Sequence, residues 1–359
     1  PESVALRYKV PLWSDEHFKL MEKSFRLIGE AGGKEITLYL AGRSCLGNEH
    51  TMVRWIKDAD APGGYRHDFS VLDRYLDLAL KHVRPRVTVL YAWEKYMGGA
   101  GRWGSSSKKV RDENTIPAKV TLLDPASGKT SLIDGPYMSG PKFDAGAAEA
   151  FWKPVLEGVL ERLRKRGIEK TAVLGMVGDG KPSKEAVALF GKLMPGVTWS
   201  ENGHVDRLGG DFHGAKITYS TSVYINSPPA PNGKRLYGWK KMGTLFPRGG
   251  PCLRGRLSAW SPPMQHRAAT ELCLMADLAG VGRFGMDFWD CVGDEKKWDR
   301  YPRSAGLSLS GRFPESDQAQ LCIDHSMRYV LAPGPKGAAP TARYENLREG
   351  IQEAQARVF

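Results

Sequence analysis

The chain has 359 residues, of which 41% are hydrophobic and 26% charged, and it carries a net charge of +12. These values exclude an intrinsically disordered chain, and the length allows one large domain or two ordinary ones. No apolar run approaches the roughly 20 residues that span a bilayer, so we expect no membrane-spanning helix. Pro1 is not an initiator residue, so a signal peptide or a further domain can precede this sequence.

Strands and helices alternate along the chain. Apolar runs predict strands at residues 4–10, 36–41, 86–92, 171–177, 197–200, 216–225, 243–247 and 283–289. Between several of them, five helices show a 3.6-residue apolar period. Ser14, Asp68 and Ser183 are suited to cap three of these helices. The other two helices are expected over residues 151–163 and 268–279. The alternation predicts an α/β fold with a mainly parallel sheet.

The number of strands and one long insertion define the expected architecture. Eight strand candidates favour a (β/α)8 barrel over an open sheet, so we expect residues 1–359 to form a single barrel domain of catalytic type. Residues 93–144 interrupt the alternation after the third strand and end in a predicted hairpin over 118–123 and 129–133. In a barrel, this insertion would overhang the active face as a lid or wall.

Acidic residues follow several predicted strand ends. Glu94 follows the third strand, Asp179 the fourth and Glu201 the fifth, while Asp287 and Asp290 bracket the end of the eighth. In a parallel barrel these strand ends share one face, where catalytic groups gather. Glycoside hydrolysis needs two carboxylates across a sugar, one to protonate the leaving oxygen and one to stabilise or attack the cationic carbon. We therefore predict Asp179, Glu94 and Glu201 as catalytic residues.

Asp179 has the most distinctive surroundings of these acids. It stands between Gly178 and Gly180 at the end of an apolar strand, and Ser183 opens a helix shortly after it. Glycine tolerates unusual backbone geometry and lets a ligand approach closely. The alternative is that Asp179 only ends the strand or caps the next turn, as aspartate often does.

Aromatic residues and cations predict the character of the substrate. Residues 212–270 contain nine lysines and arginines and no acidic residue, so this stretch favours an anionic ligand. Ten tryptophans suit a saccharide groove, in which flat sugar faces stack on indole rings, although many aromatics belong to the core. The predicted substrate-binding residues are Trp93, Tyr219, Tyr224, Arg248, Arg254, Trp260, Asp287 and Trp289.

Other kinds of site have weaker support. Residues 99–104 match the dinucleotide pattern GxGxxG, but a polar loop and a hairpin follow where the motif requires a helix. His204, Asp206, Asp211 and His213 cluster in sequence without a recognised metal-binding pattern, and five cysteines form no CxxC pair. We expect no metal and no cofactor. The net charge permits nucleic-acid binding, but no recognised motif for it accompanies the charge.

Several segments resemble the catalytic domain of glycoside hydrolase family 123. The resemblance is carried by residues 12–18 (LWSDEHF), 68–70 (DFS), 279–289 (AGVGRFGMDFW), 329–337 (YVLAPGPKG) and 340–351 (PTARYENLREGI). It implies a (β/α)8 barrel, usually preceded by a β-sandwich domain, that removes β-linked N-acetylgalactosamine. It also implies an extracellular or periplasmic bacterial protein acting in polysaccharide degradation.

The implied mechanism uses an Asp-Glu pair after the fourth strand. In the family, the substrate's acetamido oxygen attacks the anomeric carbon, the Asp steadies the resulting oxazoline and the Glu is the general acid. Here Asp179 aligns with the family's Asp, but Gly180 stands where the Glu is expected. The acid then comes from elsewhere, with Glu94 and Glu201 the nearest candidates, or the mechanism has changed, or catalysis is lost.

Two functions follow from these observations. The first is a divergent glycoside hydrolase that acts on an anionic (sulfated or uronate-bearing) or N-acetylhexosamine-containing oligo- or polysaccharide. The alternative is a non-catalytic carbohydrate-binding barrel that has lost the family's general acid. Nucleic acid is not expected as a partner.

Overall fold

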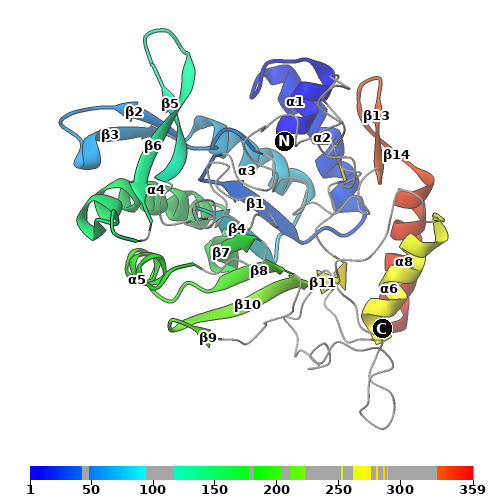
Figure 1. Ribbon diagram of the computed structural model, residues 1–359. Helices are drawn as coiled ribbons and strands as arrows, with labels where there is room; N and C mark the ends of the chain where they lie inside the picture. Colours follow the sequence, from blue (N-terminus) through cyan, green and yellow to red (C-terminus); the bar gives the residue numbers. More distant parts are fainter. Residues whose placement is uncertain are drawn as a thin grey trace, which may run out of the picture.

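A computed structural model describes residues 1–42, 48–93, 117–138, 140–177, 182–203, 211–222, 252–253, 262–275, 280–281, 286–287, 289 and 330–358. Figure 1 shows a central sheet flanked by helices, with a smaller sheet beside it. In this part of the chain, no helix combines the length and the apolar character that a membrane crossing requires.

The central sheet confirms the predicted α/β class. Seven of its strands are parallel and run in the order β1-β4-β7-β8-β10-β11-β12, and β9 pairs antiparallel with β10. The strands are β1 (Glu35–Tyr39), β4 (Val87–Tyr91), β7 (Ala172–Val177), β8 (Trp199–Gly203), β9 (Asp211–Phe212), β10 (Ala215–Ser222), β11 (Cys252–Leu253) and β12 (Gly280–Val281). The predicted strands at 36–41, 86–92, 171–177, 197–200 and 216–225 correspond to β1, β4, β7, β8 and β10.

Helices join and cover these strands. They are α1 (Glu2–Tyr8), α2 (Asp15–Glu30), α3 (Ser70–His82), α4 (Ala145–Lys165), α5 (Lys184–Leu193), α6 (Met264–Met275) and α8 (Ala342–Val358), with 3-10 turns at Pro62–Gly64 and Glu169–Thr171. Ser14 and Ser183 cap α2 and α5 as predicted, since their hydroxyls accept the backbone N–H groups of His17 and Ala186. Asp68 accepts the N–H of Ser70 at the start of α3.

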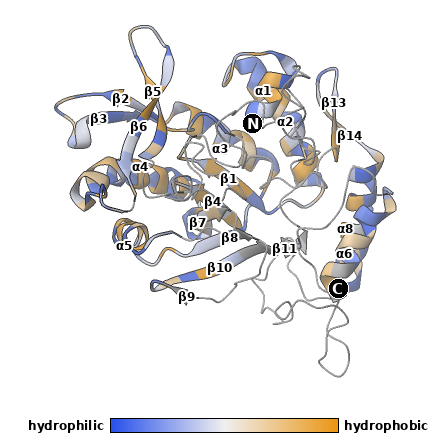
Figure 2. Cartoon of the chain, in the orientation of Figure 1, coloured by the Kyte–Doolittle hydropathy of each residue, from blue (hydrophilic) through white to orange (hydrophobic). Residues whose placement is uncertain are grey.

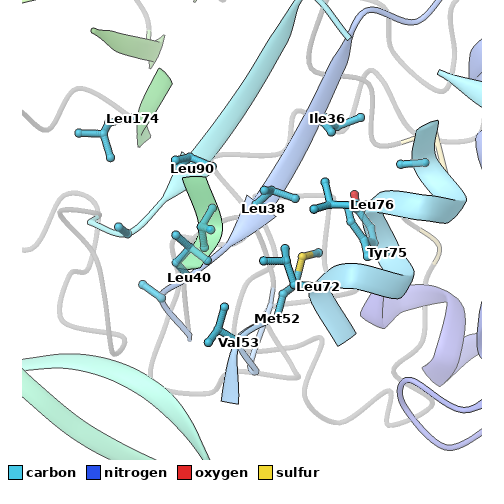
Figure 3. Close-up of a cluster of buried hydrophobic side chains, with 14 of the residues drawn as sticks. Ile36, Leu38, Leu40, Met52, Val53, Leu72, Tyr75, Leu76, Leu90 and Leu174 are labelled. Atoms are coloured by element: carbon cyan, nitrogen blue, oxygen red, sulfur yellow. The ribbon is translucent and has the colours of Figure 1, made fainter. Parts of the chain in front are cut away.

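One face of the central sheet packs against these helices. Figure 3 shows Ile36 and Leu38 of β1 beside Leu76 and Tyr75 of α3, and all four side chains are buried. In Figure 2, β1, β4 and β7 carry mostly hydrophobic residues, whereas α2 and α4 alternate hydrophobic and hydrophilic residues. Burial of the apolar face of each helix therefore holds the helices on this side of the sheet.

The predicted hairpin belongs to a second sheet. β5 (Pro117–Leu123) and β6 (Thr130–Tyr137) form an antiparallel hairpin as expected. They are joined by β2 (Arg54–Lys57) and β3 (Tyr65–Asp68) in the order β3-β2-β5-β6, an arrangement that the sequence did not predict. Trp55 of β2 stacks on Phe151 of α4 at 5.4 Å between ring centroids, which fixes this sheet to the helical layer.

One predicted strand is wrong. Residues 4–10 contribute to helix α1, because Ser3, Val4 and Ala5 are buried together while Leu6 is 45% exposed, which is helical and not alternating burial. Of the predicted strand at 283–289, the structure describes Met286, Asp287 and Trp289, and Met286 and Asp287 lie in a turn. The predicted strand at 243–247 lies outside the described residues.

The C-terminal segment forms a small hairpin and a helix. β13 (Leu331–Gly334) and β14 (Gly337–Pro340) pair antiparallel, and α8 follows and packs against α6. Gly350 permits this close crossing, since a Cβ added there would stand 2.6 Å from the carbonyl oxygen of Arg267. Figure 1 shows α6 and α8 side by side at one end of the sheet.

The inner face of the sheet carries a contact between distant strands. The hydroxyl of Tyr219 in β10 donates a hydrogen bond to Oε2 of Glu35 in β1, 2.9 Å away, although three strands separate β10 from β1 in the sheet order. Neighbouring strands are about 4.8 Å apart, so a flat sheet would hold these two strands roughly 19 Å apart. The sheet is therefore strongly curled, with Tyr219 and Glu35 on its concave side.

We expect Tyr219→Phe to destabilise the protein by about 1–2 kcal/mol, because it removes the hydrogen bond that the Tyr219 hydroxyl donates to Glu35. Glu35→Gln should have a similar effect, and urea unfolding of both single variants and the double variant measures the coupling between the two sites. If the two effects simply add, the hydrogen bond does not hold the curled sheet together.

Candidate active site

The carboxyl edge of the central sheet brings the ends of β4 and β7 together. β4 pairs with β7 in parallel from Thr88↔Ala172 to Leu90↔Leu174. β4 ends at Tyr91, three residues before Glu94, and β7 ends at Val177, two residues before Asp179. The ends of two neighbouring parallel strands thus lead to these acids, at the edge where α/β enzymes bind their ligands.

Six of the residues predicted for the site lie outside the described residues. They are Glu94, Asp179, Tyr224, Arg248, Arg254 and Trp260. The roles predicted for them stay predictions.

Glu201 lies within β8, although the sequence placed it after the strand. Its partner in β7 is Met176, and Trp199, two residues earlier, is the partner of Leu174. Trp199 packs against Phe190 of α5 with 6.1 Å between ring centroids, so residues in this register face the helices. Glu201 is 1% exposed. The catalytic role predicted for Glu201 gains no support from this position.

Trp93 is buried, and Tyr219 is half-buried. Trp93 belongs to the hydrophobic core and is 6% exposed. The Tyr219 hydroxyl is engaged by Glu35, the first residue of β1, and therefore lies near the amino end of that strand. Neither position by itself tests a contact with substrate.

Asp287 and Trp289 lie where the end of the central sheet meets the N-terminal helix and the β13–β14 hairpin. The carbonyl oxygen of Asp287 accepts a hydrogen bond from the hydroxyl of Ser3, at 3.0 Å. The indole N–H of Trp289 donates to the carbonyl of Leu331, at 2.8 Å, and its ring packs edge-on against Tyr8. Trp289 is 2% exposed, which favours a packing role over the predicted stacking on sugar.

Of the nine lysines and arginines in residues 212–270, the structure describes two, Lys216 and Arg267. Lys216 is exposed. Arg267 lies on α6, and its guanidinium binds Glu353, with Nε 2.9 Å from Oε2, and approaches Glu349 at 3.4 Å. These acids belong to α8, which is more than eighty residues further along the chain. Arg267 is therefore neutralised by the fold, and the positive field predicted from 212–270 has to come from the other cations.

No cluster of three or more metal-binding side chains exists among the described residues. Of the four residues that the sequence suggested, His204 and Asp206 lie outside the described residues, and His213 is exposed. A metal centre thus has no geometric support in the described part of the chain.

The second sheet is fastened at the carboxyl end of β1. The N–H of Gly42 donates to the carbonyl of Lys119 in β5, at 2.7 Å. The N–H of Thr51 donates to the hydroxyl of Thr121, at 2.9 Å, and the N–H of Thr121 donates to Thr51 Oγ1 at 3.1 Å. The predicted hairpin is therefore anchored on the same side of the central sheet as the ends of β4 and β7.

Sequence reasoning missed an aromatic stack on the inner face. The rings of Tyr39 in β1 and Tyr91 in β4 are stacked, with centroids 6.4 Å apart and planes inclined by 17°. Gly175 of β7 lies under the Tyr91 ring, since a Cβ at this position would be 2.5 Å from Tyr91 Cε1. The available signal was a glycine inside an apolar strand, which often marks the close approach of another group.

The comparison with known families decides the relationship of the chain. The model of the glycoside hydrolase 123 catalytic domain matches residues 1–357. The chain belongs to glycoside hydrolase family 123. No curated protein matches the sequence. As a family 123 domain, the protein is a glycoside hydrolase by relationship, and its substrate is a carbohydrate.

Proposed function

We propose that the protein cleaves glycosidic bonds in an anionic or N-acetylhexosamine-containing glycan, with Asp179 as one of two carboxylates. The observation that carries this proposal is the match of the family 123 catalytic domain over residues 1–357. The parallel pairing of β4 with β7 supports it, because that pairing brings the segments leading to Glu94 and Asp179 to one edge.

Chain geometry is compatible with an acid pair at this edge. Strands lie about 4.8 Å apart, so the segments that follow two neighbouring parallel strands start from adjacent points of one edge. A glycosidase needs two carboxylates roughly 5–9.5 Å apart, and two segments that start side by side can supply such a pair.

Glu94 is the better candidate for the missing general acid. The family's Glu position is Gly180 here, so a second carboxylate has to come from another strand. Glu201 shares the face of Trp199, against which α5 packs, whereas Glu94 follows the strand next to β7. We therefore assign the second carboxylate to Glu94 and expect Glu201→Gln to affect stability more than turnover.

We also propose that the central sheet closes into the (β/α)8 barrel that the resemblance to the family implies. The hydrogen bond between Tyr219 and Glu35 supports closure, because it requires a curl that brings β10 across to β1. A closed sheet would direct the carboxyl ends of all its strands into one mouth. The second sheet, anchored at Gly42 and Thr51, would then form a wall of that mouth.

We expect binding of a sulfated or uronate-bearing glycan to weaken steeply with salt, because exposed charges about 10 Å apart are largely screened near 0.1 M. Arg248→Gln combined with Arg254→Gln should lower the affinity and the salt dependence together, measured by calorimetry at several salt concentrations. Arg267→Gln is the matched control, since Glu353 already neutralises Arg267. Preference for a neutral glycan, or affinity indifferent to salt, would contradict an anionic substrate.

A panel of sulfated, uronic and amino-sugar glycans tests the activity itself by the sugar released. Cleavage that needs the 2-acetamido group would retain the oxazoline route implied by the family, and efficient cleavage of a substrate without that group would show a different mechanism.

The second candidate is a carbohydrate-binding barrel without catalysis, which the Gly180 position favours. It takes first place if the protein binds glycans from the panel but releases no sugar from any of them.

A further inference from the structure

The inner-face stack lies near the ends of the two strands that lead to the proposed acids. Tyr91 is the last residue of β4 and stands three residues before Glu94, while Gly175 stands four residues before Asp179. The ring of Tyr91 reaches from β4 across β7, so one side chain touches both strands that lead to the acids. It is 1% exposed, and Tyr39 covers it from β1.

Gly175 is the feature that permits this arrangement. A Cβ there would stand 2.5 Å from Cε1 and 2.7 Å from Cζ of Tyr91, and 2.7 Å from Cγ1 of Val89. Side chains essentially never approach so closely, so any other residue would displace the Tyr91 ring. The contact involves Cε1 and Cζ, so the outer end of the Tyr91 ring reaches the β7 backbone at Gly175.

We propose that Tyr91, seated on Gly175 and covered by Tyr39, is a positioning residue that sets the ends of β4 and β7 relative to each other. The β4–β7 backbone pairing is described only as far as Leu90↔Leu174. Just beyond that pair, the Tyr91 ring contacts Gly175 and so links the two strands on the inner face. The position of the acid that follows each strand then depends on this ring.

This inference rests on the proposed function for its effect on rate. A misplacement of about 1 Å in a catalytic group can cost roughly 10²-fold in rate. Loss of the contact between the Tyr91 ring and Gly175 should therefore lower kcat while KM changes less, because the groups that bind the substrate remain in place.

Two single variants and their combination test the proposal. Gly175→Ala pushes the ring off β7, and Tyr91→Leu removes the ring. We expect each to lower kcat on the best glycan of the panel by about 10²-fold. In Tyr91→Leu, the added methyl of Gly175→Ala has no ring to displace, although it still meets Val89 Cγ1, so the double variant should lose much less activity than the product of the two single effects. Tyr91→Phe keeps the ring and should retain most of the activity.

Gly191→Ala on α5 is the matched control, because no atom lies within 4 Å of its added Cβ. It should change neither kcat nor amide exchange at the sheet.

Hydrogen exchange provides a measurement that does not depend on activity. Amides at 91–93 and 175–177 should exchange about tenfold faster in Gly175→Ala and Tyr91→Leu, while amides of α2 and α3 keep the parent's rates. If the parent cleaves nothing but exchange changes in this way, the positioning role holds and the proposed function fails. Unchanged local exchange, uniform acceleration across the protein, or an unchanged kcat in Gly175→Ala of an active parent would each overturn the positioning role.

Discussion

Asp179→Asn is expected to abolish glycan cleavage and to leave folding intact. The amide keeps the shape of the side chain but can neither carry the charge nor transfer a proton. Loss of one positioned acid or base costs about 10²–10⁴-fold in rate. Initial rates on the best glycan of the panel measure the effect, and thermal unfolding confirms the fold.

Two further variants identify the partner of Asp179. Glu94→Gln should lower the rate to a similar extent, whereas Glu201→Gln should act mainly on stability, because Glu201 is buried on the face of β8 that packs against α5. A pH–rate profile that loses its basic limb, the fall in rate at high pH, in Glu94→Gln would identify Glu94 as the general acid. If Asp179→Asn cleaves as fast as the parent, another acid at the strand ends carries the chemistry.

The second large effect is a loss of stability in mild acid. Burial lowers the pKa values of His17, His67 and His266 to about 4. His17 is fully buried, its Nδ1 accepts the N–H of Trp13 at 3.0 Å, and its Nε2 contacts the carbonyl of Pro1 at 2.9 Å. These partners select the neutral ring with its proton on Nε2, so protonation of Nδ1 would break the bond to Trp13.

The direction follows from the two protonation equilibria. An unfolded histidine has a pKa near 6.5, so the unfolded chain takes up protons first as the pH falls. The contribution of each buried neutral histidine is therefore complete above about pH 6.5 and is lost progressively as the pH falls to about 4. For one histidine the loss approaches about 3 kcal/mol as an upper limit, at 1.36 kcal/mol per pKa unit.

Urea unfolding between pH 7 and 4 measures this loss. His17→Gln removes one of the three titrations and should flatten the curve of stability against pH by about one proton's slope. His213→Gln, at an exposed position, serves as the control. A parent whose free energy of unfolding is level from pH 6.5 to 4 would contradict the neutral state assigned to these rings.

The sequence predicted those parts of the fold that local patterns determine. Apolar runs located β1, β4 and β7, and capping residues located the starts of α2 and α5. Residues 4–10 misled because Val4, Leu6, Tyr8 and Val10 alternate as in a strand. The helix there depends on distant partners, since Glu2 accepts the N–H groups of Glu49 and His50, at 3.0 and 2.8 Å. Such contacts leave no period in the sequence.

The site was predictable to a similar degree. Placing acids at strand ends followed from the parallel sheet, but the face that Glu201 occupies depends on where β8 begins, and a shift of one residue reverses it. Of the second sheet, the sequence predicted the β5–β6 hairpin but not β2 and β3. These two strands are short and polar, although Pro62-Gly63-Gly64 between them is a turn signal. Gly175 alone indicates that another group approaches β7 closely, but the sequence does not show that this group is the ring of Tyr91.

The contacts of α1 have a consequence for biosynthesis. Glu2 binds residues 49 and 50, Ser3 binds the carbonyl of Asp287, and the Tyr8 hydroxyl donates to the carbonyl of Gly334 at 2.6 Å. During synthesis, residues 49 and 50 follow α1 closely, whereas Asp287 and Gly334 are made much later. Contacts so distant in sequence slow folding, because a long loop must close before they form. Helix α1 thus reaches its final place only after these residues are made, and its apolar face has to be kept from other chains until then.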